Sequence, residues 1–263
     1  MLDLTTVIEA ESRRFADAIA QAAPDAAVPT CPGWTADDLA WHLTEVHGFW
    51  ARVLTSGAQT DEESEAVEAA GPTRPGSRAE TMALFERATG QLLEALAGAE
   101  DATPAWFWLA TDRTVGATRR MQAHEATMHR VDAEAAAGLD SAPVDPRLAA
   151  DGIEHAFDVM WAWWGTQPGC SFAPGASRVE LVAEDTGHGW LVETGRWQGV
   201  GQSGKAYDVP GARRVLAGTP AARVTGSAEA LMRWLWGRGD EPAASGDAGA
   251  LDPLRAARDQ GMQ

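Results

Sequence analysis

The amino-acid sequence predicts an α+β protein in which an N-terminal up-and-down four-helix bundle precedes a small C-terminal α+β domain. Two observations support this class. Apolar residues recur at steps of three and four in several long segments as far as residue 165, which is the spacing of amphipathic helices. Beyond residue 176 the pattern changes to short β-type runs separated by turn residues. Because short connections join most of the long helices, an up-and-down arrangement is favoured.

The first helix is predicted over residues 4–22, where apolar side chains follow the helical period and Pro24 comes shortly after the end. The second helix has a start signal in its sequence. Thr35 can cap it, and Asp38 lies in an acidic first turn. Gly57 is a plausible stop for this helix, because glycine readily ends helices.

A long acidic loop is predicted over residues 57–77, since the segment is polar and interrupted by proline and glycine. Long loops in compact domains are often lids or disordered segments. Three further helices follow from periodic apolar residues. They are predicted over residues 78–98, 118–137 and 146–165.

The C-terminal part of the sequence predicts a mixed unit of strands and one helix. Short β-type runs occupy residues 178–183, 189–193 and 222–226, and a capped helix follows over residues 227–239. Residues beyond 240 are rich in alanine, glycine, proline and aspartate, which predicts a loose tail. The predicted organisation is therefore a helical domain over 1–165, an α+β domain over 176–240 and a tail over 241–263.

Composition excludes several classes of protein. The 263 residues carry a formal net charge of −17, which repels phosphate backbones and anionic lipid, so neither nucleic acid nor a membrane surface is an expected partner. No apolar run approaches the roughly 20 residues of a membrane helix, and the N-terminus shows no signal-peptide pattern. Two cysteines cannot form a disulfide scaffold, so we expect a cytoplasmic protein.

Histidines on the second and fourth predicted helices indicate a metal site. In the run HEATMH, Glu125 and His129 are four residues apart and share a helix face, whereas His124 lies about 140° away from His129. His42 lies on the apolar stripe of the second helix and should face the bundle interior, unlike His47. Two histidines and one carboxylate leave an open coordination position, which is typical of catalytic zinc sites.

The residues by themselves leave a simpler interpretation open. An inward histidine is often only hydrogen-bonded in a core, and a Glu–His pair at this spacing is often a solvated face. Asp132 can orient a ligand histidine or lie on the solvent face. Arg238, flanked by two glycines at a helix end, can simply complement the helix dipole.

Three motifs in the sequence resemble those of a known family. CPGWTADDLAWHLTEVHGFW places His42 eight residues after the tryptophan of a GWT start, and HEATMHRVDAEAAAG holds Glu125 and His129 with Asp132 three residues later. The third motif is the Gly-Arg-Gly around Arg238. In their order and spacing these motifs resemble the mycothiol-dependent maleylpyruvate isomerase family, which belongs to the DinB-like four-helix-bundle metalloenzymes.

The resemblance implies a DinB-like bundle followed by a small sterol-carrier-like α+β domain. It implies a divalent metal, most often zinc, held by His42, Glu125 and His129, and a mycothiol cofactor bound through sulfur at the open position. Arg238 would come from the second domain as a catalytic residue that holds an anionic, electrophilic substrate, because its planar fork suits a carboxylate. The implied partners are these small molecules, and the implied oligomeric state is a monomer or homodimer.

Several reactions remain open at this point. In an isomerase the thiolate adds to an activated cis double bond, and elimination returns the trans isomer. In a thiol S-transferase the sulfur stays attached to the electrophile. A third possibility is a metal-dependent hydrolase that uses metal-bound water. The fourth is a non-catalytic stress or binding protein on the same bundle.

Overall fold

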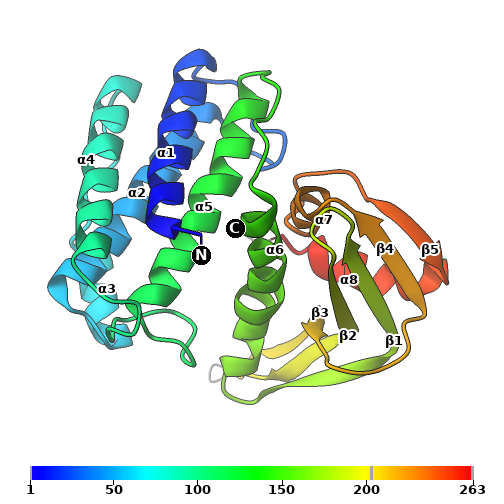
Figure 1. Ribbon diagram of the computed structural model, residues 1–263. Coiled ribbons are helices and arrows are strands. Elements are labelled where there is room, and N and C mark those ends of the chain that lie inside the picture. Colours follow the sequence, from blue (N-terminus) through cyan, green and yellow to red (C-terminus); the bar gives the residue numbers. More distant parts are fainter. Residues whose placement is uncertain (1, 202–203, 262–263) are drawn as a thin grey trace. The chain divides into compact units, whose positions relative to one another are not determined.

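The computed structural model describes residues 2–201 and 204–261, which form two compact units (Figure 1). The first unit spans residues 1–142 and the second spans residues 143–263. The division therefore falls before the segment 146–165, which the sequence analysis assigned to the helical domain. Among the described residues, no helix is both long and apolar enough to cross a bilayer.

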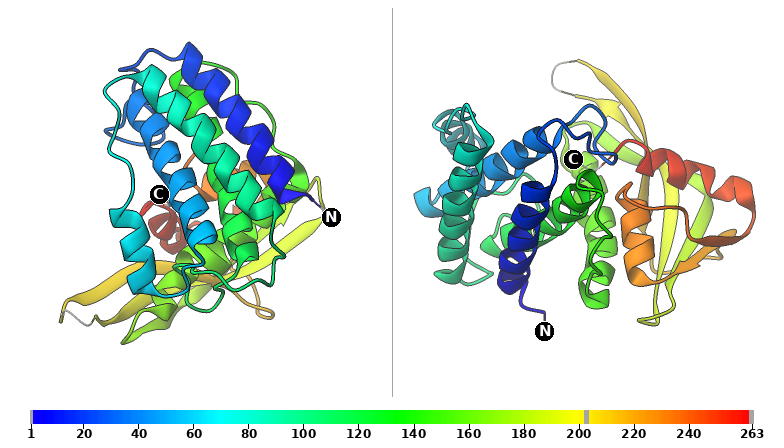
Figure 2. Two further views of the ribbon diagram at one scale, coloured as in Figure 1. Left: turned by 90° about the vertical axis from the view of Figure 1, so that its left-hand side faces the viewer. Right: turned by 90° about the horizontal axis from the view of Figure 1, so that it is seen from above.

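The N-terminal unit is helical, as predicted. Its four long helices and one short helix are α1 (Leu4–Gln21), α2 (Ala36–Ser56), α3 (Asp61–Ala69), α4 (Arg78–Ala97) and α5 (Val115–Ala136). Helices α1 and α5 pack side by side, as do α2 and α4 (Figures 1 and 2). The predicted α+β class, with helices first and a sheet domain second, is confirmed.

The structure corrects the prediction that residues 57–77 are entirely loop. Helix α3 lies within this segment and begins with a capping box, in which Thr60 accepts a hydrogen bond from the Glu63 amide and Glu63 accepts one from the Thr60 amide. The Trp106 indole Nε1 donates to Asp61 Oδ1 at 2.7 Å and anchors the helix start. Two start signals, the Thr-x-x-Glu spacing and the acidic first turn, were present in the sequence.

Helix α2 is held in place at both ends, which matters because it carries His42. Thr35 and Asp38 form a second capping box at its start. At its end, Gly57 adopts the left-handed conformation with φ 72°, which a residue with a Cβ adopts only at a cost. The capping hydrogen bonds and the charge of Arg74 lower the pKa of Asp38 to about 2.

The core of the N-terminal unit combines apolar side chains from four helices. Phe15, Leu39, Leu43, Phe85 and Ala133 are all at least 98% buried and belong to one cluster. Burying a Leu or Phe side chain contributes roughly 1.5–3 kcal/mol, so this cluster is the main force that holds α1, α2, α4 and α5 together.

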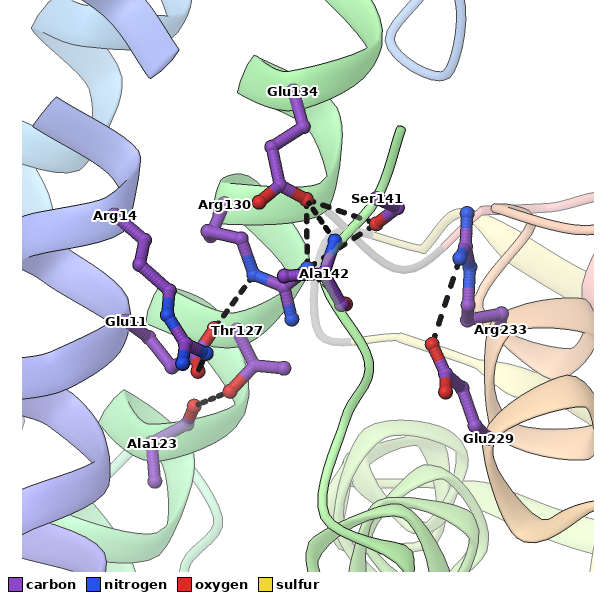
Figure 3. Close-up of polar contacts among 10 residues, drawn as sticks. All are labelled: Glu11, Arg14, Ala123, Thr127, Arg130, Glu134, Ser141, Ala142, Glu229 and Arg233. Carbon is purple, nitrogen blue, oxygen red and sulfur yellow. Dashed lines mark hydrogen bonds and ion pairs between the residues drawn. The ribbon is translucent and has the colours of Figure 1, made fainter. Parts of the chain in front are cut away.

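One fully buried cation joins α1 to α5. The Arg130 guanidinium donates from Nε to Glu11 Oε2 and from Nη1 to Glu134 Oε2, both at 2.7 Å (Figure 3). The same Nη1 donates to the Ala142 carbonyl at 2.6 Å, and Ser141 donates to Glu134 (Figure 3). Arg130 thereby also fixes the segment that leaves α5. The two carboxylates compensate the positive charge of the guanidinium, which would be costly to bury without a counter-charge.

His47 lies inside the helical core rather than on the surface. It is fully buried, stacks on Phe85 with ring centroids 5.4 Å apart, and pairs through Nδ1 with the Thr89 hydroxyl at 2.8 Å. Burial lowers the pKa of His47 to about 3; Glu125 opposes the shift, while His129 and His42 add to it. The histidine is therefore neutral in the folded protein.

The C-terminal unit begins with α6 (Pro146–His155), which continues as a π-helical turn over Ala156–Met160 and a 3-10 helix over Trp161–Thr166. The predicted helix over 146–165 is thus found, but it packs within the second unit. The Trp236 indole donates to the Gly152 carbonyl at 3.1 Å, and the Trp190 indole donates to Glu154 at 3.1 Å. These long-range contacts explain why the unit boundary could not be placed from local periodicity.

The second unit contains a five-stranded sheet with the order β3-β2-β1-β4-β5. Its strands are β1 (Cys170–Ala183), β2 (His188–Val200), β3 (Ala206–Arg214), β4 (Ala222–Gly226) and β5 (Ala243–Gly246). Strand β1 pairs antiparallel with β2 and parallel with β4. The three predicted strands lie within β1, β2 and β4, whereas β3 and β5 were not predicted.

Helix α7 (Ala228–Leu235) confirms the predicted C-terminal helix, although it ends earlier than residue 239. The predicted loose tail is corrected for residues 241–261. Strand β5 pairs with β4, and α8 (Asp252–Arg258) buries Leu254 and Ala257 completely. The composition of this segment concealed its structure, because only a few apolar residues are needed when a sheet supplies the opposing surface.

We predict that Arg130→Leu lowers the free energy of unfolding by about 3–5 kcal/mol, because it removes the cation that pairs with buried Glu134 and leaves Glu11 only its ion pair with the exposed Arg14. The measurement is chemical denaturation at pH 7, followed by circular dichroism. Arg13→Leu is the matched control, since Arg13 forms an exposed pair with Glu9 and should cost no more than about 1 kcal/mol. Equal losses in the two variants would contradict a structural role for the buried network.

We predict that His47 makes the protein less stable in acid. Its pKa is about 3 in the folded protein, against 6.5 for an ordinary histidine in the unfolded chain, so below pH 6.5 the unfolded chain binds a proton that the folded chain does not. Stability therefore falls as the pH decreases, by about 2 kcal/mol between pH 7.5 and pH 5 for this one group. His47→Asn should remove that part of the pH dependence. Parallel stability–pH curves for the two proteins would show that the prediction is wrong.

Candidate metal centre

Three side chains that the sequence analysis singled out lie together in the N-terminal unit. Glu125 Oε1 lies 3.4 Å from His42 Nε2 and 3.2 Å from His129 Nε2. One ligand atom from each of the three residues lies within 4.8 Å of the others. Helix α2 contributes His42, and one face of α5 contributes Glu125 and His129. The predicted triad therefore shares a common centre.

The local sequence explains how these side chains converge. Glu125 and His129 are four residues apart on α5, so they lie on the same face one above the other. The imidazole rings of His42 and His129 meet edge to face, with centroids 4.8 Å apart. Trp34, which precedes the cap of α2, packs its ring 4.8 Å from that of His42. The GWT motif thus supplies both the helix start and a wall for the histidine.

Asp132 orients His129 from behind. The Nδ1–H of His129 donates to Asp132 Oδ2 at 2.9 Å, while Thr30 donates to Asp132 Oδ1 at 2.5 Å. The Cys31 thiol lies 3.5 Å from Oδ2, and Asp132 is fully buried. Of the two positions that the sequence left open for Asp132, the structure shows the one beside the histidine. With Nδ1 turned toward Asp132, the other ring nitrogen, Nε2, is the one that faces His42 and Glu125.

The electrostatics of the cluster follow from this geometry. For His129, burial disfavours the charged ring, but the hydrogen bonds and charges of Asp132 and Glu125 outweigh it and raise the pKa to about 9. For Glu125, burial favours the neutral acid, but hydrogen bonds from His129 and His42 and their charges lower its pKa well below its usual range. The carboxylate is therefore ionised and holds a proton on His129 near neutral pH.

These residues fit a divalent cation. A metal ion would take the place of the proton that His129 holds beside Glu125. Zinc is commonly bound by neutral imidazole nitrogens and carboxylate oxygens, which are the groups present here. A carboxylate behind the ligating histidine is the usual outer partner in zinc sites. A second group of potential ligands, formed by Cys31, His129 and Asp132, is buried and shares one member, His129, with the candidate triad. In the structure Asp132 accepts a hydrogen bond from His129, and the Cys31 thiol lies against Asp132.

The other sequence candidates lie elsewhere. His124 is buried on α5 and belongs to neither group of potential ligands among the described residues. Arg238 lies in the C-terminal unit, two residues after Trp236, whose carbonyl accepts a 2.7 Å hydrogen bond from Arg238 Nη1. Gly237 precedes it with φ 74°, so the chain turns sharply at the end of α7. Sequence reasoning missed the roles of Thr30 and Cys31, which contact Asp132 across about a hundred residues of chain.

Comparisons with known proteins agree with this architecture. Residues 6–134 match the model for the mycothiol maleylpyruvate isomerase N-terminal domain, and residues 147–253 match the corresponding C-terminal domain. A search of curated proteins found no match.

Two solved structures are similar to the whole chain. One is described as the crystal structure of the mycothiol-dependent maleylpyruvate isomerase, and the other as that of a mutant with one histidine replaced by alanine. Each has a TM-score of 0.61 and 14% sequence identity, and the match covers 94% of this chain and 95% of the other. This likeness shows a shared fold. Since the two family models together span both units, the chain belongs to the mycothiol-dependent maleylpyruvate isomerase family.

Proposed function

We propose that the protein is a mycothiol-dependent metalloenzyme that acts on a small electrophile, with a divalent metal, preferably zinc, held by His42, Glu125 and His129. The observation that supports this most strongly is the convergence of two imidazoles and one carboxylate within 4.8 Å. Three protein ligands leave a fourth position for an exogenous group, which is the pattern of a catalytic rather than a structural site. Mycothiol is proposed as the thiol because the descriptions of the family and of the similar structures name it.

The metal, when bound, supplies the positive charge that keeps a coordinated thiol deprotonated near neutral pH. The protein supplies the fixed geometry. Asp132 holds the His129 ring by its Nδ1–H, and Thr30 in turn holds Asp132. Trp34 packs against His42. Because both ligand histidines are held in this way, little of their side-chain freedom has to be lost when the metal binds.

Arg238 is proposed to bind the anionic part of the electrophile. Its guanidinium is oriented by the bond to the Trp236 carbonyl, and its planar fork can form two parallel hydrogen bonds to a carboxylate. Its own carbonyl accepts a hydrogen bond from Arg233 Nε at 3.3 Å, which supports the turn after α7. The family name makes cis–trans isomerisation the first reaction to test, and S-transfer to a different electrophile is the second.

We predict that the purified protein binds one equivalent of zinc and that His42→Ala, Glu125→Ala and His129→Ala each abolish stoichiometric binding. The measurement is metal content by mass spectrometry after dialysis, with circular dichroism to show that each variant is folded. His47→Asn is the control, because His47 is a buried histidine on α2 outside the ligand group. Wild type that takes up no metal while folded would overturn the metalloenzyme proposal.

We predict that zinc-loaded protein isomerises maleylpyruvate only when mycothiol is present.

Arg238→Met should lower kcat/KM by about 10- to 100-fold, the effect of losing charge-assisted hydrogen bonds to a carboxylate. Arg238→Lys should recover only part of the loss. The control is Arg223→Met, which removes an exposed ion pair with Glu180 in the same unit.

Two outcomes of this assay point elsewhere. Turnover without any thiol favours the hydrolase interpretation, and unchanged kinetics in Arg238→Met show that this arginine has only a structural role.

A further inference from the structure

A pocket of about 350 Å³ lies beside α2 in the N-terminal unit, and none of the interactions described above occupies it. Helix α2 forms one side of the pocket, and the end of α3 with the segment after it forms the other. The residues that matter here are Glu45, Phe49, Trp50, Arg52, Glu68 and Gly71.

The pocket and the candidate metal centre share helix α2, although none of the three candidate ligands lines the pocket. Glu45 follows His42 by three residues and Phe49 follows it by seven, so all three share one face of α2. Burial raises the pKa of Glu45, whereas the charge of His42 opposes that shift, which shows that the two side chains are within electrostatic reach. The candidate metal centre and the pocket therefore follow one another along the same face of α2.

Arg52 is the least satisfied group in the pocket. Its Nε is buried without a hydrogen-bond partner, and the Arg52 side chain forms no ion pair or hydrogen bond within residues 2–201 and 204–261. The guanidinium fits between two glycines, because a Cβ at Gly48 would lie 3.1 Å from Nη1 and a Cβ at Gly71 would lie 3.1 Å from Nη2. A partly buried cation without a protein partner indicates a hydrogen-bond acceptor from outside the chain.

The other lining residues restrict what that acceptor can be. Glu45 and Glu68 each bring a carboxylate, so with Arg52 the pocket carries one more negative than positive charge. An anionic ligand is therefore disfavoured, and an ammonium group would be repelled by Arg52. Hydroxyl groups suit both kinds of neighbour, because they donate to carboxylates and accept from a guanidinium.

An aromatic wall completes the pocket. Trp50 stacks on Trp106 with centroids 5.6 Å apart, and Phe49 meets Trp106 edge to face at 5.9 Å. Such rings contact the apolar C–H faces of a polyol while the charged groups bind its hydroxyls.

We propose that this pocket binds a neutral polyol, namely the hydroxyl-rich part of the thiol cofactor that lies away from its sulfur, with Arg52 as its main hydrogen-bond donor. The proposal rests on the function proposed above. Because the guanidinium lies level with Gly48, six residues beyond His42, it is about 9 Å further along the helix axis. A cofactor that reaches both places must be an elongated thiol rather than a small one.

The test is calorimetric titration of the zinc-loaded protein with mycothiol and with N-acetylcysteine, a small thiol without a polyol. The wild type should bind mycothiol at least about tenfold more tightly. Arg52→Met should weaken mycothiol binding by about 10- to 100-fold and leave N-acetylcysteine binding unchanged. Arg87→Met is the matched control, because Arg87 is an exposed arginine on α4 that does not line the pocket.

Glu68→Gln is a second variant that guards against misfolding of Arg52→Met, since Glu68 is exposed and its replacement is nearly isosteric. It should also reduce the preference for mycothiol. If the preference persists in both variants, or if both thiols lose affinity equally, the polyol subsite is overturned.

Failure of the proposed function has a different signature, in which neither thiol binds to zinc-loaded wild type. The pocket is then tested alone by saturation-transfer NMR with myo-inositol and with glutarate. Binding of myo-inositol that is lost in Arg52→Met supports the polyol site. Binding of glutarate instead, or of neither probe, overturns it.

Discussion

The arrangement of His129 between two carboxylates is the constraint on which the rest of the candidate site depends. Asp132 accepts from its Nδ1 at 2.9 Å and Glu125 faces its Nε2 at 3.2 Å, so the ring has a fixed orientation. Without the metal, this ring holds a proton that offsets part of the negative charge. In the proposed metal-bound state, the same geometry would present a nitrogen lone pair beside a carboxylate oxygen. A single buried arrangement therefore serves both states.

Such a cluster requires a rigid and well-compensated surrounding. The helical unit provides it in two ways. Apolar side chains from α1, α2, α4 and α5 form a continuous core, and the charge of Arg130, buried on the same helix as Glu125, is compensated by Glu11 and Glu134. Capping boxes and Arg78, which donates to the Ile19 and Ala22 carbonyls, hold the ends of helices in place. Polar groups in this unit thus fix positions, while apolar burial supplies most of the stability.

Helix α2 connects the chemistry to the proposed recognition of the cofactor. It presents His42 near its N-terminal end, Glu45 and Phe49 further along the same face, and Arg52 beyond them. Since one helix carries all of these residues, the distance from His42 to the pocket is set by the helical rise and not by loop geometry. The end of α3 and the segment after it line the other side of the pocket, so the acidic region between α2 and α4 forms part of its wall.

The sequence by itself determined the fold class, the long helices and the shared helix face of Glu125 and His129, because helix periodicity fixes which side chains share a face. The convergence of His42 with these two residues was an expectation from the family resemblance, and the packing of α2 against α5 decided it. The sequence left open whether Asp132 is buried, and it gave no sign that Thr30 and Cys31 contact it, because these contacts join residues about a hundred positions apart. Strands β3 and β5, helix α8 and the membership of α6 in the second unit were also decided by tertiary structure. Each depends on an opposing surface, such as the sheet that buries Leu254, and local periodicity carries no information about the partner across a packed interface.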